Sequence, residues 1–206
     1  MADRRYVIGV SGRSGSGKST FVRRIMEYFG SDMVCLHTMD NYYLPSEQQV
    51  ADEKEFLNFD LPTSFDRDKF HSDLEALRKG EQVQLAEYEF TNENPSNNVF
   101  TLYSAPIILV EGLFVYHYKE INKLLDFKVM IQVTYDKCYN RRLNRDLKER
   151  NYSEDQTNYR YNAHVEPAYK SYIEPYVDEC DLKIDNEQNL EAGLQILVSR
   201  IKNAID

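Results

Sequence analysis

Tryptophan is absent from this sequence of 206 residues, which contains only eight glycines, six prolines and three cysteines. These low glycine and proline contents exclude a collagen-like chain and a low-complexity, disordered chain. The cysteines, Cys35, Cys138 and Cys180, are odd in number and far apart, so they predict neither a disulfide framework nor the paired ligands of a zinc site. Such cysteine usage fits the reducing cytoplasm.

Long apolar runs are also missing. The longest, from Ile107 to Val115, is interrupted by Glu111 and Gly112, and it is far shorter than the roughly 20 residues of a membrane span. The first residues, MADRRYVIGVSG, hold too short an apolar run for a secretory signal. We therefore expect a cytoplasmic protein with no membrane partner.

Basic residues are fewer than acidic ones, 25 Lys and Arg against 34 Asp and Glu, which gives a net charge of −9. Nucleic-acid phosphates require a basic surface, so nucleic acid is not an expected partner. The hydrophobic and charged fractions, 42% and 29%, are those of an ordinary globular protein. A chain of this length can bury its own core, and we expect one domain over residues 1–206.

Short apolar runs alternate with amphipathic segments along the chain. The apolar runs predict strands at Tyr6–Val10, Val34–Met39, Ile107–Val110, Phe127–Thr134 and Leu182–Ile184. Apolar residues at helical spacing predict helices at Lys18–Phe29, Phe65–Lys79, Asp136–Arg150, Asp155–Tyr172 and Asn189–Ile205. This alternation predicts an α/β fold with a mostly parallel central sheet.

Two segments depart from the alternation. Gln82–Phe90 and Val99–Tyr103 favour β structure and are separated by TNENPSNN, a turn signal, so they predict a β-hairpin insertion at about 82–103. Asp40–Pro62 is acidic, aromatic and irregular. We interpret it as a functional loop that contains a short helix.

A glycine-rich segment connects the first predicted strand to the first predicted helix. Residues Gly12–Ser19, GRSGSGKS, match the pattern G-x-x-x-x-G-K-[ST], in which backbone N–H groups and the helix N-terminus bind phosphates. A plain turn would explain the glycines but not the Lys-Ser pair at its fixed offset. Lys18 would neutralise the β- and γ-phosphates of ATP, and Ser19 would ligate Mg²⁺. The ATP-binding residues predicted here are Gly12, Ser14, Gly15, Ser16, Gly17, Lys18, Ser19 and Thr20.

This motif predicts a P-loop NTPase with three α/β/α layers. A regulatory GTPase would need Asp-x-x-Gly and Asn-Lys-x-Asp, and neither is present. A motor ATPase normally needs a longer chain. Phosphoryl transfer to a small molecule fits the length best, and a nucleotide-binding regulatory protein without turnover is the alternative from another class.

Two carboxylates follow predicted strands at the edge where the phosphate loop lies. Asp40 ends the second strand and Glu111 ends Ile107–Val110, and ligands of open α/β sheets bind at the carboxyl ends of the strands. We assign Asp40 as the catalytic base and Glu111 to the magnesium shell. Either one alone could instead cap a turn. In NFDLPTSFD, Asp60 is the functional candidate and Asp66 the helix cap.

One predicted helix is rich in basic residues, although the chain as a whole is acidic. Its cations are Lys137, Arg141, Arg142, Arg145, Lys148 and Arg150. Because Arg142 and Arg145 share a face, we expect a lid at about 141–160, with Arg145 stabilising charge on the transferred phosphate. The alternative is a solvated helix with exposed ion pairs.

Aromatic and histidine residues carry less information. The tyrosines Tyr152, Tyr159, Tyr161, Tyr169, Tyr172 and Tyr176 can stack on a base, but we expect most of them to pack in a core or an oligomer interface. The four histidines are dispersed, and we assign none of them to catalysis or metal binding.

With these residues in place, the chain resembles the uridine kinases of the nucleoside kinase and phosphoribulokinase branch of P-loop kinases. The resemblance runs from Tyr6 to about Asn186. Its marks are GVSGRSGSGKST, MDNYY, NFDLPTSFD, the YEF hairpin, VEGLF and RRLNRDLKER. It implies transfer of the γ-phosphoryl group of ATP, with Mg²⁺, to the 5′-hydroxyl of uridine or cytidine. A relative acting on another riboside or on a sugar phosphate is the alternative.

The resemblance also implies roles for single residues. It supports Asp40 as the base and Ser19 and Glu111 as magnesium-shell residues, and it implies that Arg145 and Arg150 face the triphosphate. The implied nucleoside pocket consists of Tyr43, Phe59, Asp60, Tyr88, Phe90 and Arg142, with Asp60 and Arg142 on the ribose. Members of the family are typically tetrameric, so the resemblance allows a homo-oligomer.

The sequence departs from the family pattern where the base is recognised. No histidine follows Tyr88 and Phe90, Tyr152 replaces an expected arginine, and Arg160 replaces an expected glutamine. We expect ribose recognition to survive and base recognition to be loosened. Two alternatives remain open: Asn92 or Glu93 replaces the histidine, or Arg160 binds an anionic group of another substrate.

Overall fold

The computed structural model describes residues 5–188 and 190–205. Its centre is a five-stranded sheet in the order β2-β7-β1-β8-β9, and every neighbouring pair is parallel. The strands are β1 (Tyr6–Gly12), β2 (Val34–Thr38), β7 (Ile107–Glu111), β8 (Phe127–Gln132) and β9 (Leu182–Asp185). Each lies on one of the predicted apolar runs, which confirms the α/β prediction. Runs without polar alternation form such strands because both faces of a parallel sheet are covered.

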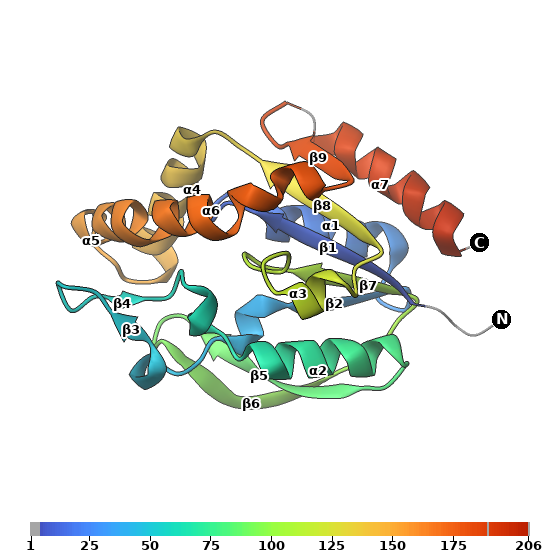
Figure 1. Cartoon of the computed structure of the whole chain (residues 1–206), viewed down its shortest axis with the longest axis horizontal. Helices are drawn as coiled ribbons and strands as arrows, with labels where there is room; N and C mark the ends of the chain where they lie inside the picture. Colours follow the sequence, from blue (N-terminus) through green and yellow to red (C-terminus); the bar gives the residue numbers. More distant parts are fainter. Residues whose placement is uncertain (1–4, 189, 206) are drawn as a thin grey trace.

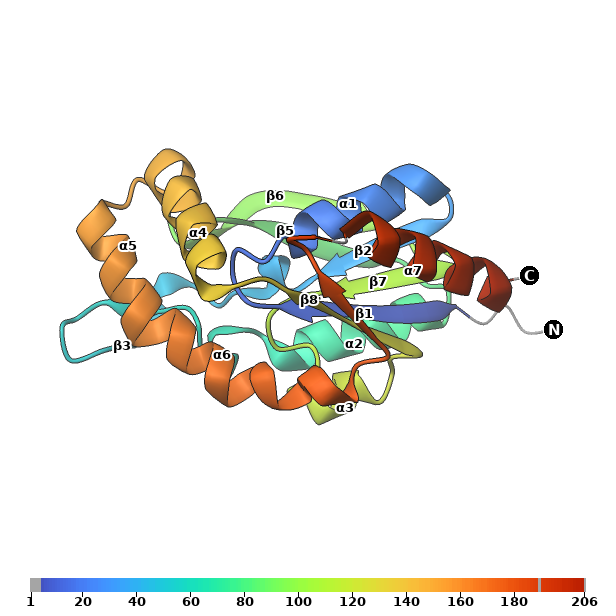
Figure 2. The ribbon, with the colours of Figure 1, turned by 90° about the horizontal axis from the view of Figure 1, so that it is seen from above.

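Helices cover both faces of the sheet (Figures 1 and 2). One face carries α1 (Lys18–Phe29) and α7 (Leu190–Ile205), and the other carries α2 (Arg67–Arg78), α3 (Lys119–Asn122) and α6 (Glu166–Tyr172). Within β1, Val7 packs toward α2, whereas Ile8 and Val10 pack toward α1 and α7. Asn189, the predicted start of the last helix, lies outside the described residues. Within the described ranges, no helix combines the length and hydropathy needed to cross a membrane.

The hairpin is confirmed, but the predicted limits of its second strand are wrong. The strands are β5 (Val83–Glu89) and β6 (Asn94–Leu102), so only residues 90–93 form the connection. Most of TNENPSNN therefore belongs to β6. Its polar residues are compatible with a strand because most of β6 is exposed. Pro95 is tolerated because β6 pairs with β5 alone, beside an irregularity of the ladder.

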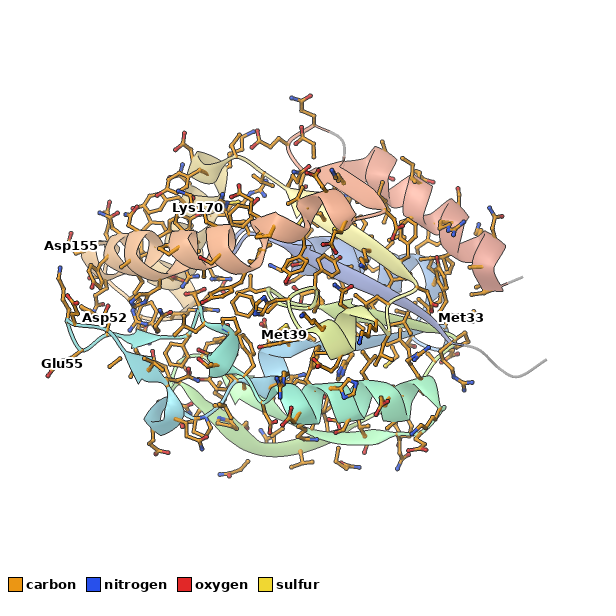
Figure 3. All side chains as sticks on the ribbon, in the orientation of Figure 1. Met33, Met39, Asp52, Glu55, Asp155 and Lys170 are labelled. Carbon is orange, nitrogen blue, oxygen red and sulfur yellow. The ribbon has the colours of Figure 1, made fainter. Side chains whose placement is uncertain are left out.

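The irregular segment after β2 contains three 3₁₀ helices, Met39–Tyr42, Ser46–Gln48 and Pro62–Ser64. It also forms a two-stranded ribbon of β3 (Val50–Ala51) and β4 (Leu57–Asn58), which strands of two residues are too short to reveal in a sequence pattern. The outer end of this ribbon, with Asp52 and Glu55, lies beside the helix that carries Asp155 (Figure 3). There the Tyr159 hydroxyl donates to Asp52 Oδ2 at 2.8 Å.

A helical region follows β8. It comprises α4 (Tyr135–Glu149), α5 (Glu154–Arg160), a π-helical turn at Tyr161–Val165, then α6 and a 3₁₀ helix at Glu174–Glu179. The helix predicted over Asp155–Tyr172 is confirmed, since the backbone is helical throughout, and the π turn at its centre is the feature that the sequence analysis did not predict. Pro167 explains the π turn, because proline has no N–H to continue the regular hydrogen-bond ladder. Elsewhere Asp66 caps α2 as predicted, since its side chain accepts from Lys69 N at 3.0 Å.

Candidate active site

A cleft of about 280 Å³ opens at the carboxyl ends of β1, β2 and β7. Of the residues predicted for the site, those that line it are Ser14, Gly15, Gly17, Lys18, Ser19, Thr20, Asp40, Tyr43, Phe59, Asp60, Tyr88, Phe90, Glu111, Arg142, Arg145 and Arg150. Gly12 and Ser16 are not in its wall, because both are buried within the loop below it. The structure thus brings together residues from the whole length of the predicted pattern.

The loop between β1 and α1 requires its glycines for two physical reasons. Gly15 and Gly17 have φ of +82° and +94°, in the left-handed region that disfavours residues with a side chain. A Cβ on Gly15 would lie 2.5 Å from the Cys138 carbonyl oxygen, and one on Gly17 would lie 2.3 Å from Asn186 Nδ2. The loop is therefore closed tightly against α4 and the segment after β9.

Carbonyl oxygens of this loop are engaged from outside. Asn186 Nδ2 donates to Ser16 O at 2.6 Å, and Arg141 Nη1 donates to the same oxygen at 3.3 Å. Lys18 Nζ lies over the loop and donates to Gly12 O at 3.2 Å. α1 begins at Lys18 without a side-chain cap and without an acidic residue in its first turn. The N–H groups at the start of α1 are uncapped, Lys18 adds a positive charge, and the loop carbonyl oxygens that would repel an anion already accept hydrogen bonds. Together these features favour the binding of an anion in the cleft.

Asp40 and Glu111 both line the cleft, Glu111 at the end of β7 and Asp40 in the 3₁₀ helix that follows β2. Thr38 caps the 3₁₀ helix that begins at Met39, labelled in Figure 3, and this helix carries Asp40. The Thr38 hydroxyl also donates to Glu111 Oε2 at 2.9 Å. Burial, together with the charge of Asp40, raises the pKa of Glu111 to about 7, against the lowering effect of Lys18. Two carboxylates held this way favour a cation between them.

Arg142 connects the phosphate loop to the acidic loop. Its Nη1 donates to Ser14 Oγ at 3.0 Å and to Asp60 Oδ1 at 3.4 Å, and its Nε donates to Asp146 Oδ2 at 3.1 Å. Burial opposes the charge of this guanidinium, but Asp60 and Asp146 outweigh it and raise its pKa. Arg142 is therefore a fixed cation beside Asp60. The family resemblance likewise implies that these two residues lie together.

Asp146 lies behind the cleft and pairs with its arginines, and the sequence analysis assigned it no role. It is fully buried, and besides Arg142 it binds Arg145 Nε at 3.3 Å and Arg150 Nε at 3.8 Å. Its spacing of four residues from both Arg142 and Arg150 is a signal that could have identified it. One carboxylate thus orients three arginines of the cleft.

An aromatic wall lies beside Asp60. The Tyr43 ring is 6.1 Å from Phe59, 5.1 Å from Tyr88 and 5.7 Å from Phe90, measured between centroids. The guanidinium of Arg150 lies over the Phe90 ring at 4.2 Å, so this arginine contacts the aromatic wall. We define the aromatic wall as Tyr43, Phe59, Tyr88 and Phe90. It offers a planar ligand apolar faces to stack on.

Two residues that depart from the family pattern, Tyr152 and Arg160, also lie in this cleft, and so does Glu93, a candidate to replace the missing histidine. The cleft is also lined by Gly112, Leu113 and Arg141, and the sequence analysis did not assign these three to the site. Asn92 instead donates to Glu89 at the hairpin turn. Of the two candidates to replace the missing histidine, the structure therefore places Glu93 in the cleft.

The tyrosines outside the cleft mainly pack against other residues, as predicted. Tyr161 is fully buried between Tyr135 and Tyr139. Tyr169 stacks on Arg13, whose guanidinium lies 3.7 Å from the ring centroid. Tyr152, in contrast, is a lining residue of the cleft.

Comparisons with known proteins agree with this geometry. Residues 7–191 match the family described as the phosphoribulokinase / uridine kinase family. A uridine kinase of Chlamydia pneumoniae is 33% identical over 97% of this chain and 90% of its own length. A uridine kinase of Deinococcus deserti is 32% identical over 98% of each chain. The structure of phosphoribulokinase from Rhodobacter spheroides aligns with a TM-score of 0.64 at 13% identity, covering 92% of this chain and 74% of that one, and shows the shared fold. Since the family match spans nearly the whole chain and includes the phosphate loop, the chain belongs to the phosphoribulokinase and uridine kinase family of phosphotransferases with an alcohol acceptor.

Proposed function

We propose that this protein transfers the γ-phosphoryl group of ATP to the 5′-hydroxyl of a pyrimidine nucleoside, uridine or cytidine. The observation that carries the proposal is the joining of three parts in one cleft: the phosphate loop, the carboxylate of Asp40, and an aromatic wall beside Asp60 and Arg142. The curated relatives named above, which are uridine kinases, support it.

The donor side of the cleft fits the triphosphate of ATP. The loop residues from Gly12 to Thr20 would surround the phosphates, and Lys18 and Arg145 would offset the charge that develops during transfer. Arg150 would stand between the triphosphate and the aromatic wall.

The donor side also fits Mg²⁺. Hydroxyl and carboxylate oxygens are the ligands that this ion prefers, and Glu111 is a buried carboxylate whose pKa is raised by burial and by Asp40. Ser19 and Glu111 would hold the ion directly or through its water. The ion would neutralise charge on the β- and γ-phosphates.

The acceptor side fits a riboside. Asp40 would take the proton of the attacking hydroxyl. Asp60 and Arg142 are buried and held 3.4 Å apart, so a carboxylate and a guanidinium can bind the two ribose hydroxyls together. The aromatic wall would stack on the base, and a sugar phosphate has no aromatic ring that could make this contact.

Three other expectations remain proposals. We propose that residues 1–206 act as a single kinase domain with its hairpin insertion and helical lid, that it works in the cytoplasm without a nucleic-acid partner, and that it forms a homo-oligomer. Light scattering of the purified protein measures the last of these.

A screen of ADP release tests the proposed function. The wild type should release ADP with Mg-ATP and uridine or cytidine, and a regulatory protein without turnover would release none with any nucleoside or sugar phosphate. Asp40→Asn should lower kcat by at least about 100-fold while ATP affinity stays unchanged, because the base acts on the acceptor. Glu47→Gln is the control, since it removes an acidic charge from the same loop outside the cleft. Collapse of ATP binding in Asp40→Asn would make Asp40 chiefly a metal ligand.

A further inference from the structure

Glu93 lies in the turn between β5 and β6 with a backbone that is unusual for its residue type. Its φ is +56°, in the left-handed region that non-glycine residues seldom adopt. Local strain of this kind persists where surrounding contacts impose it, and it clusters at ligand sites. Two side chains of the lid region contact Glu93.

Tyr152 and Arg160 hold the Glu93 carboxylate by one oxygen. The Tyr152 hydroxyl donates to Glu93 Oε1, and Arg160 Nη2 lies 4.0 Å from the same atom. The other oxygen, Oε2, has no hydrogen bond among the described residues, and the side chain lines the cleft with 26% of its surface exposed. One acceptor atom is thus fixed in place and open to a ligand.

Arg160 is itself immobilised. Its Nη1 donates to Leu57 O at 3.2 Å, and its guanidinium lies 4.5 Å from the Tyr152 ring centroid and 5.5 Å from that of Phe56. Its Nε is buried and has no hydrogen-bond partner in the described part of the chain. Its Nη2, 4.0 Å from Glu93 Oε1, has no hydrogen bond among the described residues, so the cluster of Glu93, Tyr152 and Arg160 presents an acceptor oxygen near a donor nitrogen.

The cluster adjoins the aromatic wall through the hairpin. Glu93 follows Phe90 in the same turn, and the rings of Tyr88 and Phe90 are 5.1 Å apart. A base stacked on this wall would direct its polar edge toward the cluster, while its ribose would reach Asp60 and Arg142. An anionic group is unsuitable at this edge because it would meet the Glu93 carboxylate.

Resting on the proposed function, we propose that Glu93 is a specificity-determining residue that selects a base with an exocyclic amine next to a ring acceptor. Cytidine is then preferred to uridine. A carboxylate can only accept hydrogen bonds, and carboxylate with the cytosine N4 amine is a standard pairing. Arg160 Nη2, which lies 4.0 Å from Glu93 Oε1, would donate to the neighbouring ring nitrogen. Uracil offers a single N–H between two carbonyl oxygens, so a carboxylate close to that N–H also meets oxygen lone pairs.

The test compares kcat/KM for cytidine and uridine in the wild type and in two variants. The wild type should prefer cytidine by at least about tenfold, the low end for one well-placed base contact. Glu93→Gln should reduce the preference to within about threefold, because an amide can donate to a carbonyl as well as accept from an amine. Glu87→Gln is the matched control on the same hairpin, where Glu87 is exposed and outside the cleft, and it should keep the wild-type preference.

Two outcomes would overturn the inference alone: a wild type that uses uridine at least as well as cytidine, or a Glu93→Gln variant with an unchanged ratio. Phosphorylation of neither nucleoside by the wild type would instead refute the proposed function, and the inference with it. Tyr152→Phe gives a second check that retains the ring under Arg160. It removes the hydroxyl that holds Glu93, so the preference should fall while the melting temperature stays close to that of the wild type.

Discussion

Replacing Asp146 with asparagine would remove the charge on which Arg142, Arg145 and Arg150 converge. The carboxylate is fully buried, and the side chain of its nearest partner, Arg142, is only 7% exposed. An amide of the same shape still accepts a hydrogen bond, but within the described residues it leaves the buried guanidinium with Asp60 as its only close carboxylate.

The cost follows from the burial of this pair. Removing one partner of a buried ion pair typically costs about 3–5 kcal/mol. We expect the low end, about 3 kcal/mol, because the amide retains one hydrogen bond and because Arg145, 34% exposed, is screened by water. At about 2–4 °C per kcal/mol for a domain of this size, the melting temperature should fall by about 6–12 °C.

Thermal unfolding of Asp146→Asn beside Glu149→Gln measures this effect. Both changes remove one negative charge from α4, but Glu149 is exposed, so its variant should stay within about 0.5 kcal/mol of the wild type. The KM for the nucleoside should also rise in Asp146→Asn, because Arg142 loses its orientation. Equal melting temperatures for the two variants would show that Asp146 does not organise the arginines.

Lys18→Ala should lower kcat by at least about 100-fold with an unchanged melting temperature, because it removes a charge at the transferred phosphate; unchanged turnover in a coupled ADP assay would refute the role of the phosphate loop. Gly15→Ala should abolish ATP binding in calorimetry, whereas Gly30→Ala should retain it. Both glycines have a positive φ, but a Cβ would meet Cys138 O only at Gly15, so equal loss in both variants would exclude the steric reason. Asp52→Asn should speed hydrogen exchange in the β3–β4 ribbon relative to Glu53→Gln, because Asp52 accepts from Tyr159 and contacts His164 Nε2 at 2.7 Å. Burial raises the pKa of Asp52, but these partners outweigh it and hold the pKa at about 2. Protection of the ribbon should therefore persist at neutral pH and be lost only as the pH falls from about 4 toward 2. Equal exchange at pH 7 in both variants would contradict the role of Asp52.

The sheet and the phosphate loop could be predicted because their signals are local. β1 and β7 are apolar runs, and Gly12–Ser19 requires particular residue types at adjacent positions. The capping role of Asp66 is local in the same sense, since a cap binds a backbone N–H within one turn. The strand β6 was underestimated because an edge strand with an exposed face need not be apolar.

The base-reading end of the site could not be predicted in full. The sequence identified the departures at Tyr152 and Arg160, but not that they contact Glu93, which lies about sixty residues earlier in the chain. Contacts across that separation depend on how the hairpin packs against the lid, which no local pattern encodes. The π turn was not predicted for a related reason. A proline near the centre of a helix indicates that the regular hydrogen bonding is interrupted, but it does not specify the form of the interruption.

The position of phosphate in the reaction product tests the central claim most directly. The protein would be incubated with Mg-ATP and cytidine, and ³¹P NMR of the purified product would locate the new phosphate ester. We predict cytidine 5′-monophosphate and one ADP for each molecule formed, with at least about 100-fold less product from Asp40→Asn in the same time. A phosphate ester on the 2′- or 3′-hydroxyl, or ADP formed without any phosphorylated nucleoside, would contradict the placement of the ribose beside Asp60 and of its 5′-hydroxyl at Asp40.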